Sequence, residues 1–130
     1  MKKYAICRTG WLDYFTVKVY SNVKHMRIGI TRDGGTPDGS CIALVQPAVS
    51  MTNPRHIGEF TSNMFATMYL NEDHMGRDIL VHECLHVALA HERFVERFRM
   101  YYGLECGAQE ERLAYYLSEI YVELTRRLRK

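Results

Sequence analysis

Two long amphipathic stretches in the second half of the sequence set the strongest limit on how the chain can fold. From about residue 75 to residue 102, apolar side chains recur every three or four positions, which predicts a helix with one buried face. The stretch turns more polar at residues 90–93, where the helix could break. A second amphipathic helix is expected from about residue 108 to residue 127. The apolar positions are Leu80, Val81, Cys84, Leu85, Ala88 and Leu89 in the first stretch, and Leu113, Leu117, Ile120, Tyr121, Leu124 and Leu128 in the second.

The first 70 residues have the alternating apolar and polar pattern that is typical of strands. The expected strands cover residues 14–20, 26–31, 41–45 and 65–70, of which the first two form a β-hairpin, and glycine- and proline-rich loops cover residues 33–39 and 50–58. We therefore predict an α+β fold. In it, a small, twisted, mainly antiparallel sheet of about four or five strands packs on the two helices.

The length and composition fit one globular domain that spans residues 1–130. With 47% hydrophobic and 25% charged residues, the chain lies far from the composition of disordered proteins. A formal net charge of +2 is too small to indicate a nucleic-acid partner. The basic residues at the C-terminus, Arg126, Arg127, Arg129 and Lys130, are expected to form a solvated helix face.

The cysteines and the N-terminal segment predict the cellular compartment of the protein. The four cysteines, Cys7, Cys41, Cys84 and Cys106, form no CxxC pair, which excludes a zinc knuckle and a thioredoxin-like motif. The N-terminus lacks the apolar run of a signal peptide, and no apolar stretch approaches the roughly 20 residues that span a bilayer. We therefore expect a cytoplasmic protein with free thiols and no membrane partner.

The segment His82-Glu83-Cys84-Leu85-His86 is an HExxH motif. Residues four apart lie on the same face of a helix, so both imidazoles can reach one Zn²⁺ at about 2.0–2.1 Å. Glu83 would lie beside the metal, where a base must be to take a proton from a water molecule. Chance produces this motif in roughly one such chain in fifty, and the alternative is a pair of ordinary packed or surface histidines.

A catalytic zinc site usually has three protein ligands and one open position. The metzincin arrangement requires glycine and histidine where this chain has Leu89 and Glu92, so that class is excluded. A glutamate from the second helix is a better third ligand, and Glu110 and Glu111 are both available there. The periodicity of that helix favours Glu110, which falls within the apolar stripe, whereas Glu111 lies about 120° away from it.

The HExxH motif, together with the segment Glu111-Arg112-Leu113-Ala114-Tyr115, resembles the gluzincin type of zincin metallopeptidase. The resemblance is to the short phage- and bacterium-encoded proteins that include the ImmA/IrrE group, in which an HExxH helix precedes a Glu-x-x-Ala-Tyr or similar pattern. It covers residues 75–121. It implies a mini-zincin fold and a zinc-dependent peptidase, and it assigns the third ligand to Glu111.

Zincins commonly add a hydrogen-bond donor that stabilises the oxyanion formed during hydrolysis. The candidates in this chain, each of which could instead be structural, are Tyr115, Tyr116, His74 and His91. Of these we select Tyr115.

We therefore predict a zinc metallopeptidase that acts on a peptide or protein substrate. His82, His86 and Glu111 would be its metal ligands. The strand at residues 65–70, just before the HExxH helix, would be the edge strand to which an extended peptide adds. Two alternatives stay open. One is a zinc-binding regulator that cleaves nothing and acts on a host or partner protein, and the other is a nucleic-acid-binding module that uses the basic C-terminus.

Overall fold

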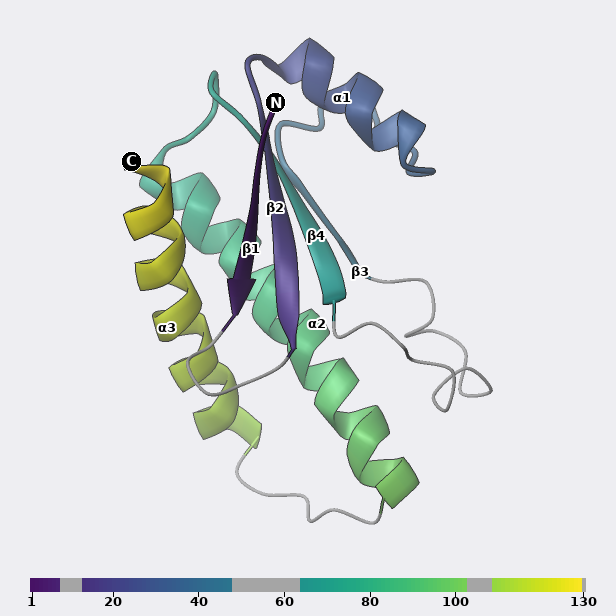
Figure 1. Ribbon diagram of the computed structural model, residues 1–130, viewed down its shortest axis with the longest axis vertical. Helices are drawn as coiled ribbons and strands as arrows, with labels where there is room; N and C mark the ends of the chain where they lie inside the picture. The colour runs from purple at the N-terminus through teal and green to yellow at the C-terminus, as the bar shows by residue number, and fades with distance from the viewer. Residues whose placement is uncertain (8–12, 48–63, 103–108, 130) are drawn as a thin grey trace.

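The computed structural model describes residues 1–7, 13–47, 64–102 and 109–129 (Figure 1). Its elements in chain order are β1 (Lys2–Cys7), β2 (Tyr14–Tyr20), α1 (Val23–Arg32), β3 (Leu44–Pro47), β4 (Met64–Asn71), α2 (Arg77–Tyr102) and α3 (Gln109–Leu128). Within these ranges, no helix is both long enough and apolar enough to cross a bilayer.

The four strands form one mixed sheet in the order β1-β2-β4-β3. β2 pairs with β1 and β3 pairs with β4 in antiparallel fashion, whereas β2 and β4 run parallel. Parallel neighbours need a crossover connection, and α1 lies in the segment that joins β2 to β4. The coarse prediction of an α+β fold with a small sheet is confirmed, while its mini-zincin character stays a prediction.

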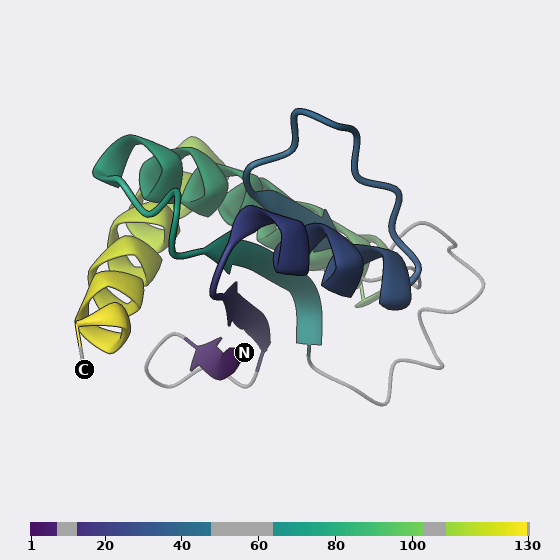
Figure 2. The same cartoon turned by 90° about the horizontal axis from the view of Figure 1, so that it is seen from above.

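The sheet separates two apolar cores, because alternate side chains of a strand point to opposite faces. On one face, residues of β2 such as Val17 and residues of β4 such as Met68 pack against α2 and α3. On the other face, Tyr69 packs against Met26 and Ile30 of α1. Figure 2 shows α2 and α3 on one side of the strands and α1 on the other.

The expected hairpin strand at residues 26–31 is wrong, because this segment lies within α1. The helix begins after Asn22, whose side-chain oxygen accepts a hydrogen bond from the backbone N–H of His25 at 2.8 Å. This contact satisfies one of the N–H groups that lack a partner inside the first turn. The residues expected to turn between two strands therefore start a helix.

Burial within α1 follows the period of a helix. Met26 and Ile30, which are four residues apart, are fully buried, whereas Ile28 between them is 47% exposed. A strand would have placed all three side chains on the same face. The short run of alternating apolar residues fits the period of a strand and that of a helix. Contact with Tyr69 of the sheet selects the helix.

The other expected elements are found with small shifts. The strands predicted at residues 41–45 and 65–70 are β3 and β4. The helices predicted at residues 75–102 and 108–127 are α2, which is continuous through residues 90–93, and α3. β1 was not predicted. The loop at residues 33–39 contains neither helix nor strand, and the loop at residues 50–58 lies outside the described residues.

The expectation that the strand at residues 65–70 lies at a sheet edge is also wrong. β4 lies between β2 and β3, so both of its edges are paired. In the sheet as described, the strands at the two ends are β1 and β3. Strand order depends on contacts between residues far apart in the sequence, and the apolar pattern within one strand carries no record of them.

Replacing Asn22 tests the assignment of α1. We expect Asn22→Ala to lower the free energy of unfolding by about 1 kcal/mol, because the first turn of the helix loses its capping acceptor. Urea unfolding followed by circular dichroism measures the change. Asn22→Ser, which keeps a capping oxygen, is the control and should retain most of the stability; equal stability of the Ala and Ser variants would contradict the assignment.

Candidate metal centre

The packing of α2 determines how the HExxH residues are presented. Cys84, Val87 and Ala88 are buried against the sheet and α3, so the opposite side of the helix faces solvent. His82 and His86 lie on that exposed side, one turn apart, as the spacing predicts. Amphipathic packing therefore leaves both imidazoles accessible.

The two imidazoles converge. The Nε2 atoms of His82 and His86 are 3.2 Å apart, the ring centroids are 4.8 Å apart, and the ring planes meet at 70°. Two nitrogen ligands of one tetrahedral zinc ion would lie about 3.3–3.4 Å apart, given Zn–N distances of about 2.0–2.1 Å. The pair therefore fits two positions of a zinc site. The same separation also suits a hydrogen bond between two neutral rings, so the distance alone is compatible with both arrangements.

Glu83 lies at the border between the exposed and buried sides of α2. It is only 6% exposed, and burial raises the pKa of its carboxyl above the ordinary value of 4.5, while the charges of protonated His86 and His82 act to lower it. Within the described part of the chain its carboxylate forms neither a hydrogen bond nor an ion pair. A buried carboxylate without a partner is costly, and this is the situation in which a nearby cation would stabilise it.

A cleft of about 560 Å³ adjoins this carboxylate. One wall is the first two turns of α2, and the other is the segment that leads into β3. The residues that line the cleft are Asp38, Ser40, Cys41, Ile42, Ala43, Leu44, Asp78, Ile79, His82 and Glu83. Sequence reasoning identified the first wall by its motif but not the second, which carries only the glycine and proline signals of a loop.

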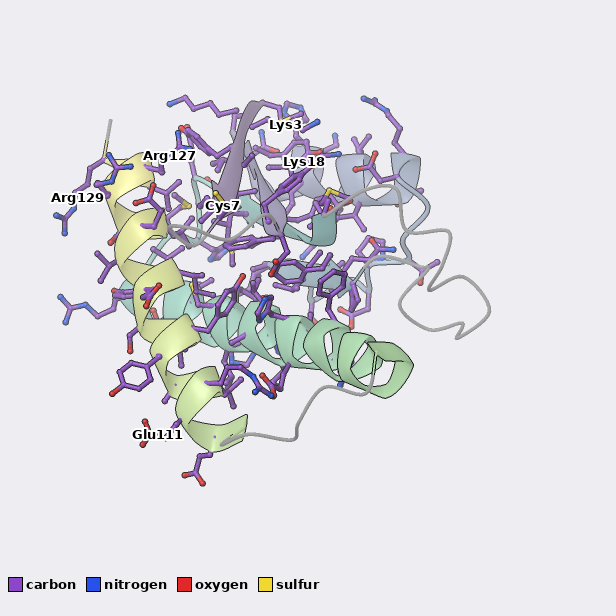
Figure 3. All side chains as sticks on the ribbon, turned by 60° about the horizontal axis from the view of Figure 1, so that its bottom comes forward. Lys3, Cys7, Lys18, Glu111, Arg127 and Arg129 are labelled. Carbon is purple, nitrogen blue, oxygen red and sulfur yellow. The ribbon has the colours of Figure 1, made fainter. Side chains whose placement is uncertain are left out.

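The structure does not bring Glu111 to the histidine pair. Both Glu110 and Glu111 are exposed in the first turn of α3, and Figure 3 shows Glu111 at the outer end of that helix. Among the residues that the structure describes, no group of three or more His, Cys, Asp or Glu side chains could hold a metal. The assignment of Glu111 as the third ligand therefore stays a prediction that depends on the resemblance.

Contacts between α2 and α3 explain the position of Glu111. Arg112 forms an ion pair with Glu92 of α2, and its Nε donates a hydrogen bond to Glu92 Oε2 at 3.0 Å. This contact holds Arg112 on the side of α3 that faces α2. Glu111, about 100° away around the helix, is left facing solvent.

The candidates for oxyanion stabilisation lie in other surroundings. Tyr115 is 61% exposed on α3, and no described contact of its side chain supports the predicted role. His91 and Tyr116 are each 1% exposed and stack on one another, with ring centroids 4.0 Å apart and an interplanar angle of 6°. His91 Nε2 also lies 2.5 Å from Asp13 Oδ2. His91 and Tyr116 thus belong to the apolar core, and the long-range pairing with Asp13 left no signal in the sequence.

The cysteine inside the motif is buried, as expected for a small apolar side chain. Cys84 is fully buried, and burial raises the pKa of its thiol to about 12, so the thiol is neutral near pH 7. The described cysteines, Cys7, Cys41 and Cys84, are free, in agreement with the sequence prediction for these three.

The pH dependence of the stability of the metal-free protein tests whether the carboxyl of Glu83 is buried. Because folding raises the pKa of Glu83, its contribution to stability is fully present below pH 4.5 and is lost as the pH rises through the folded-state pKa. We expect Glu83→Gln to match wild type near pH 4 and to be more stable than wild type at pH 7. Urea unfolding in the presence of a chelator measures the difference.

Glu72→Gln is the control, since it removes a carboxylate from an exposed turn outside the cleft. A difference between Glu83→Gln and wild type that does not grow with pH would contradict the burial of an ionisable Glu83.

Comparisons with protein-family models, with curated proteins and with solved structures found no match for this chain. The function is therefore argued from the site itself.

Proposed function

We propose that this chain is a zinc-dependent peptidase in which His82 and His86 bind the metal and Glu83 is the general base. The observation that carries the proposal is the convergence of the two Nε2 atoms, 3.2 Å apart, next to a buried carboxylate without a hydrogen-bond partner. Neutral imidazoles are common zinc ligands, and a carboxylate beside them has the position that a base requires. The cleft of about 560 Å³ gives a substrate access to both.

The chain's own residues supply the proton transfers. Bound zinc would polarise the carbonyl of the scissile peptide bond and lower the pKa of water. Glu83 would take a proton from the attacking water and pass it to the leaving amine. A carboxylate suits this exchange because it can accept a proton from metal-activated water and, once protonated, is more acidic than the ammonium of the leaving amine, so the proton can pass on.

The edge of the sheet supports a peptide as the substrate. β3 is an end strand of the sheet, and Leu44 at its start also lines the cleft. An extended peptide that paired with the outer edge of β3 would therefore pass along the cleft that contains His82 and Glu83. In this proposal β3 takes the role that the sequence pattern suggested for β4.

The second candidate is a zinc-binding regulator without peptidase activity, which the convergence of the two Nε2 atoms supports equally because it requires the metal ligands alone. The basic C-terminus gives less support to nucleic-acid binding. Arg127 donates a hydrogen bond to the carbonyl of Ala5, and Arg126 is paired with Glu123, so these charges are partly engaged within the fold.

Metal content and peptide cleavage together test the proposal. We expect purified protein to bind a single zinc ion and to cleave peptides, and His82→Ala and His86→Ala to lose both properties because each removes a ligand. Glu83→Gln should keep the zinc and lower the cleavage rate by at least about 100-fold, since only the base is removed. Elemental analysis and a fluorogenic peptide assay measure the two properties.

His25→Ala is the matched control, because it removes an exposed imidazole in α1. It should change neither the zinc content nor the rate. Zinc binding without cleavage in wild type would refute the peptidase and support the regulator, and the absence of zinc would refute both.

Zinc affinity can also identify the third ligand. We expect Glu111→Gln to weaken zinc binding by about tenfold or more and Glu110→Gln to leave it unchanged, as the resemblance implies. Competition with a chromogenic chelator measures the affinity. The opposite result would support Glu110, which the helix periodicity favours, and equal affinities would place the third ligand elsewhere.

A further inference from the structure

The cleft beside Glu83 is bounded by carboxylates on both sides. Asp38 belongs to the wall that leads into β3, and Asp78 belongs to the first turn of α2. Among the described residues that line this cleft, none is a lysine or an arginine. Arg27 is a described cation whose charge acts on Asp38. Its Nε donates a hydrogen bond to the carbonyl of Cys41 at 3.0 Å, and it does not line the cleft.

Contacts with Ser40 hold Asp38 as a carboxylate. The backbone N–H and the hydroxyl of Ser40 donate to Asp38 Oδ1 at 2.8 and 2.7 Å, and these hydrogen bonds lower the pKa of Asp38. They occupy Oδ1 of the carboxylate, and the backbone N–H of Cys41 also helps to lower the pKa of Asp38. Asp78 is exposed in the first turn of α2, where the N-terminal end of a helix favours negative charge.

The buried carboxylate of Glu83 is an independent indication that this cleft accepts a positively charged ligand. It is 94% buried by exposed area, lines the cleft and has no described hydrogen-bond partner. In the proposed function, Glu83 and the two histidines account for one end of the cleft. Asp38 and Asp78 are two further negative charges that this function does not use.

We propose that Asp38 and Asp78 bind a cationic group of the peptide substrate. The group is an ammonium or guanidinium, carried by a lysine or arginine side chain or by a free amino terminus. This inference rests on the proposed function for the path of the peptide along β3. Two carboxylates that line one cleft, with no described lysine or arginine beside them in its lining, favour such a group, because a neutral side chain would displace their water without replacing the hydrogen bonds.

Peptide binding to Glu83→Gln protein tests the inference without turnover. The probes are short alanine-rich peptides with an uncharged fluorescent label. One set is N-acetylated with a central lysine or arginine, a matched set has norleucine or citrulline there, and a third has a free amino terminus only. We expect the cationic peptides to bind about five- to tenfold more tightly than their neutral counterparts by fluorescence anisotropy, with the difference shrinking as salt is added.

Three variants assign the preference to the aspartates. Asp38→Asn and Asp78→Asn keep the shape of each side chain and should each reduce the preference, and the double variant should abolish it. Glu72→Gln, outside the cleft, should keep it in full. Thermal unfolding of each variant confirms that it is folded, and comparison of the peptide sets shows whether a side chain or the terminus carries the charge.

Equal affinity for charged and neutral peptides, a preference that survives in the double variant, or no measurable binding by any peptide would overturn the inference. The proposed function fails by different measurements. Loss of zinc binding with an intact charge preference would refute the peptidase alone, and peptide cleavage without a charge preference would refute the cation site alone.

Discussion

The packing of α2 on the sheet is the interaction on which the rest of the site depends. Fully buried Cys84 and Val87 hold one side of the helix against β2, β4 and α3, and this determines which side faces solvent. His82 and His86 are exposed because they lie opposite that contact. Core packing thus decides that both imidazoles reach solvent, while their four-residue spacing on the helix brings the two Nε2 atoms within 3.2 Å of each other. A rotation of α2 by one residue, about 100°, would bury one of them.

Glu83 has its properties because it lies where the buried and exposed sides of α2 meet. The core beneath it removes water from its carboxyl, which raises the pKa, while the cleft leaves a path for a ligand to reach it. Burying a carboxylate without a partner destabilises a fold, and such groups occur most often where function requires them. The position of Glu83 therefore destabilises the fold and also raises the basicity of its carboxylate. The carboxylates of Asp38 and Asp78 extend the negative charge along the cleft.

The fold was predictable where a periodic pattern was long. α2 and α3 are helices as predicted, but three residues of the face expected to be buried in α2, namely Val81, Leu85 and Leu89, are 38–41% exposed. The pattern failed at α1, where Met26, Ile28 and Ile30 fit both a strand and a helix, and contact with the sheet selects the helix. It also failed for β4, whose central place depends on pairing with β2 on one side and β3 on the other. β2 is separated from β4 in the chain by α1 and β3, so the pattern within β4 carries no record of that pairing.

The sequence by itself determined that two histidines and a glutamate share one helix and that the histidines project from the same face, because the geometry of a helix follows from local spacing alone. Only the tertiary structure decided what surrounds them. It made β3 the end strand beside the cleft, brought Asp38 and Asp78 into the lining of one cleft, and turned Arg112 toward α2 so that Glu111 faces solvent. These relations join residues far apart along the chain, and the path of the chain between them is set by packing, which no local motif encodes.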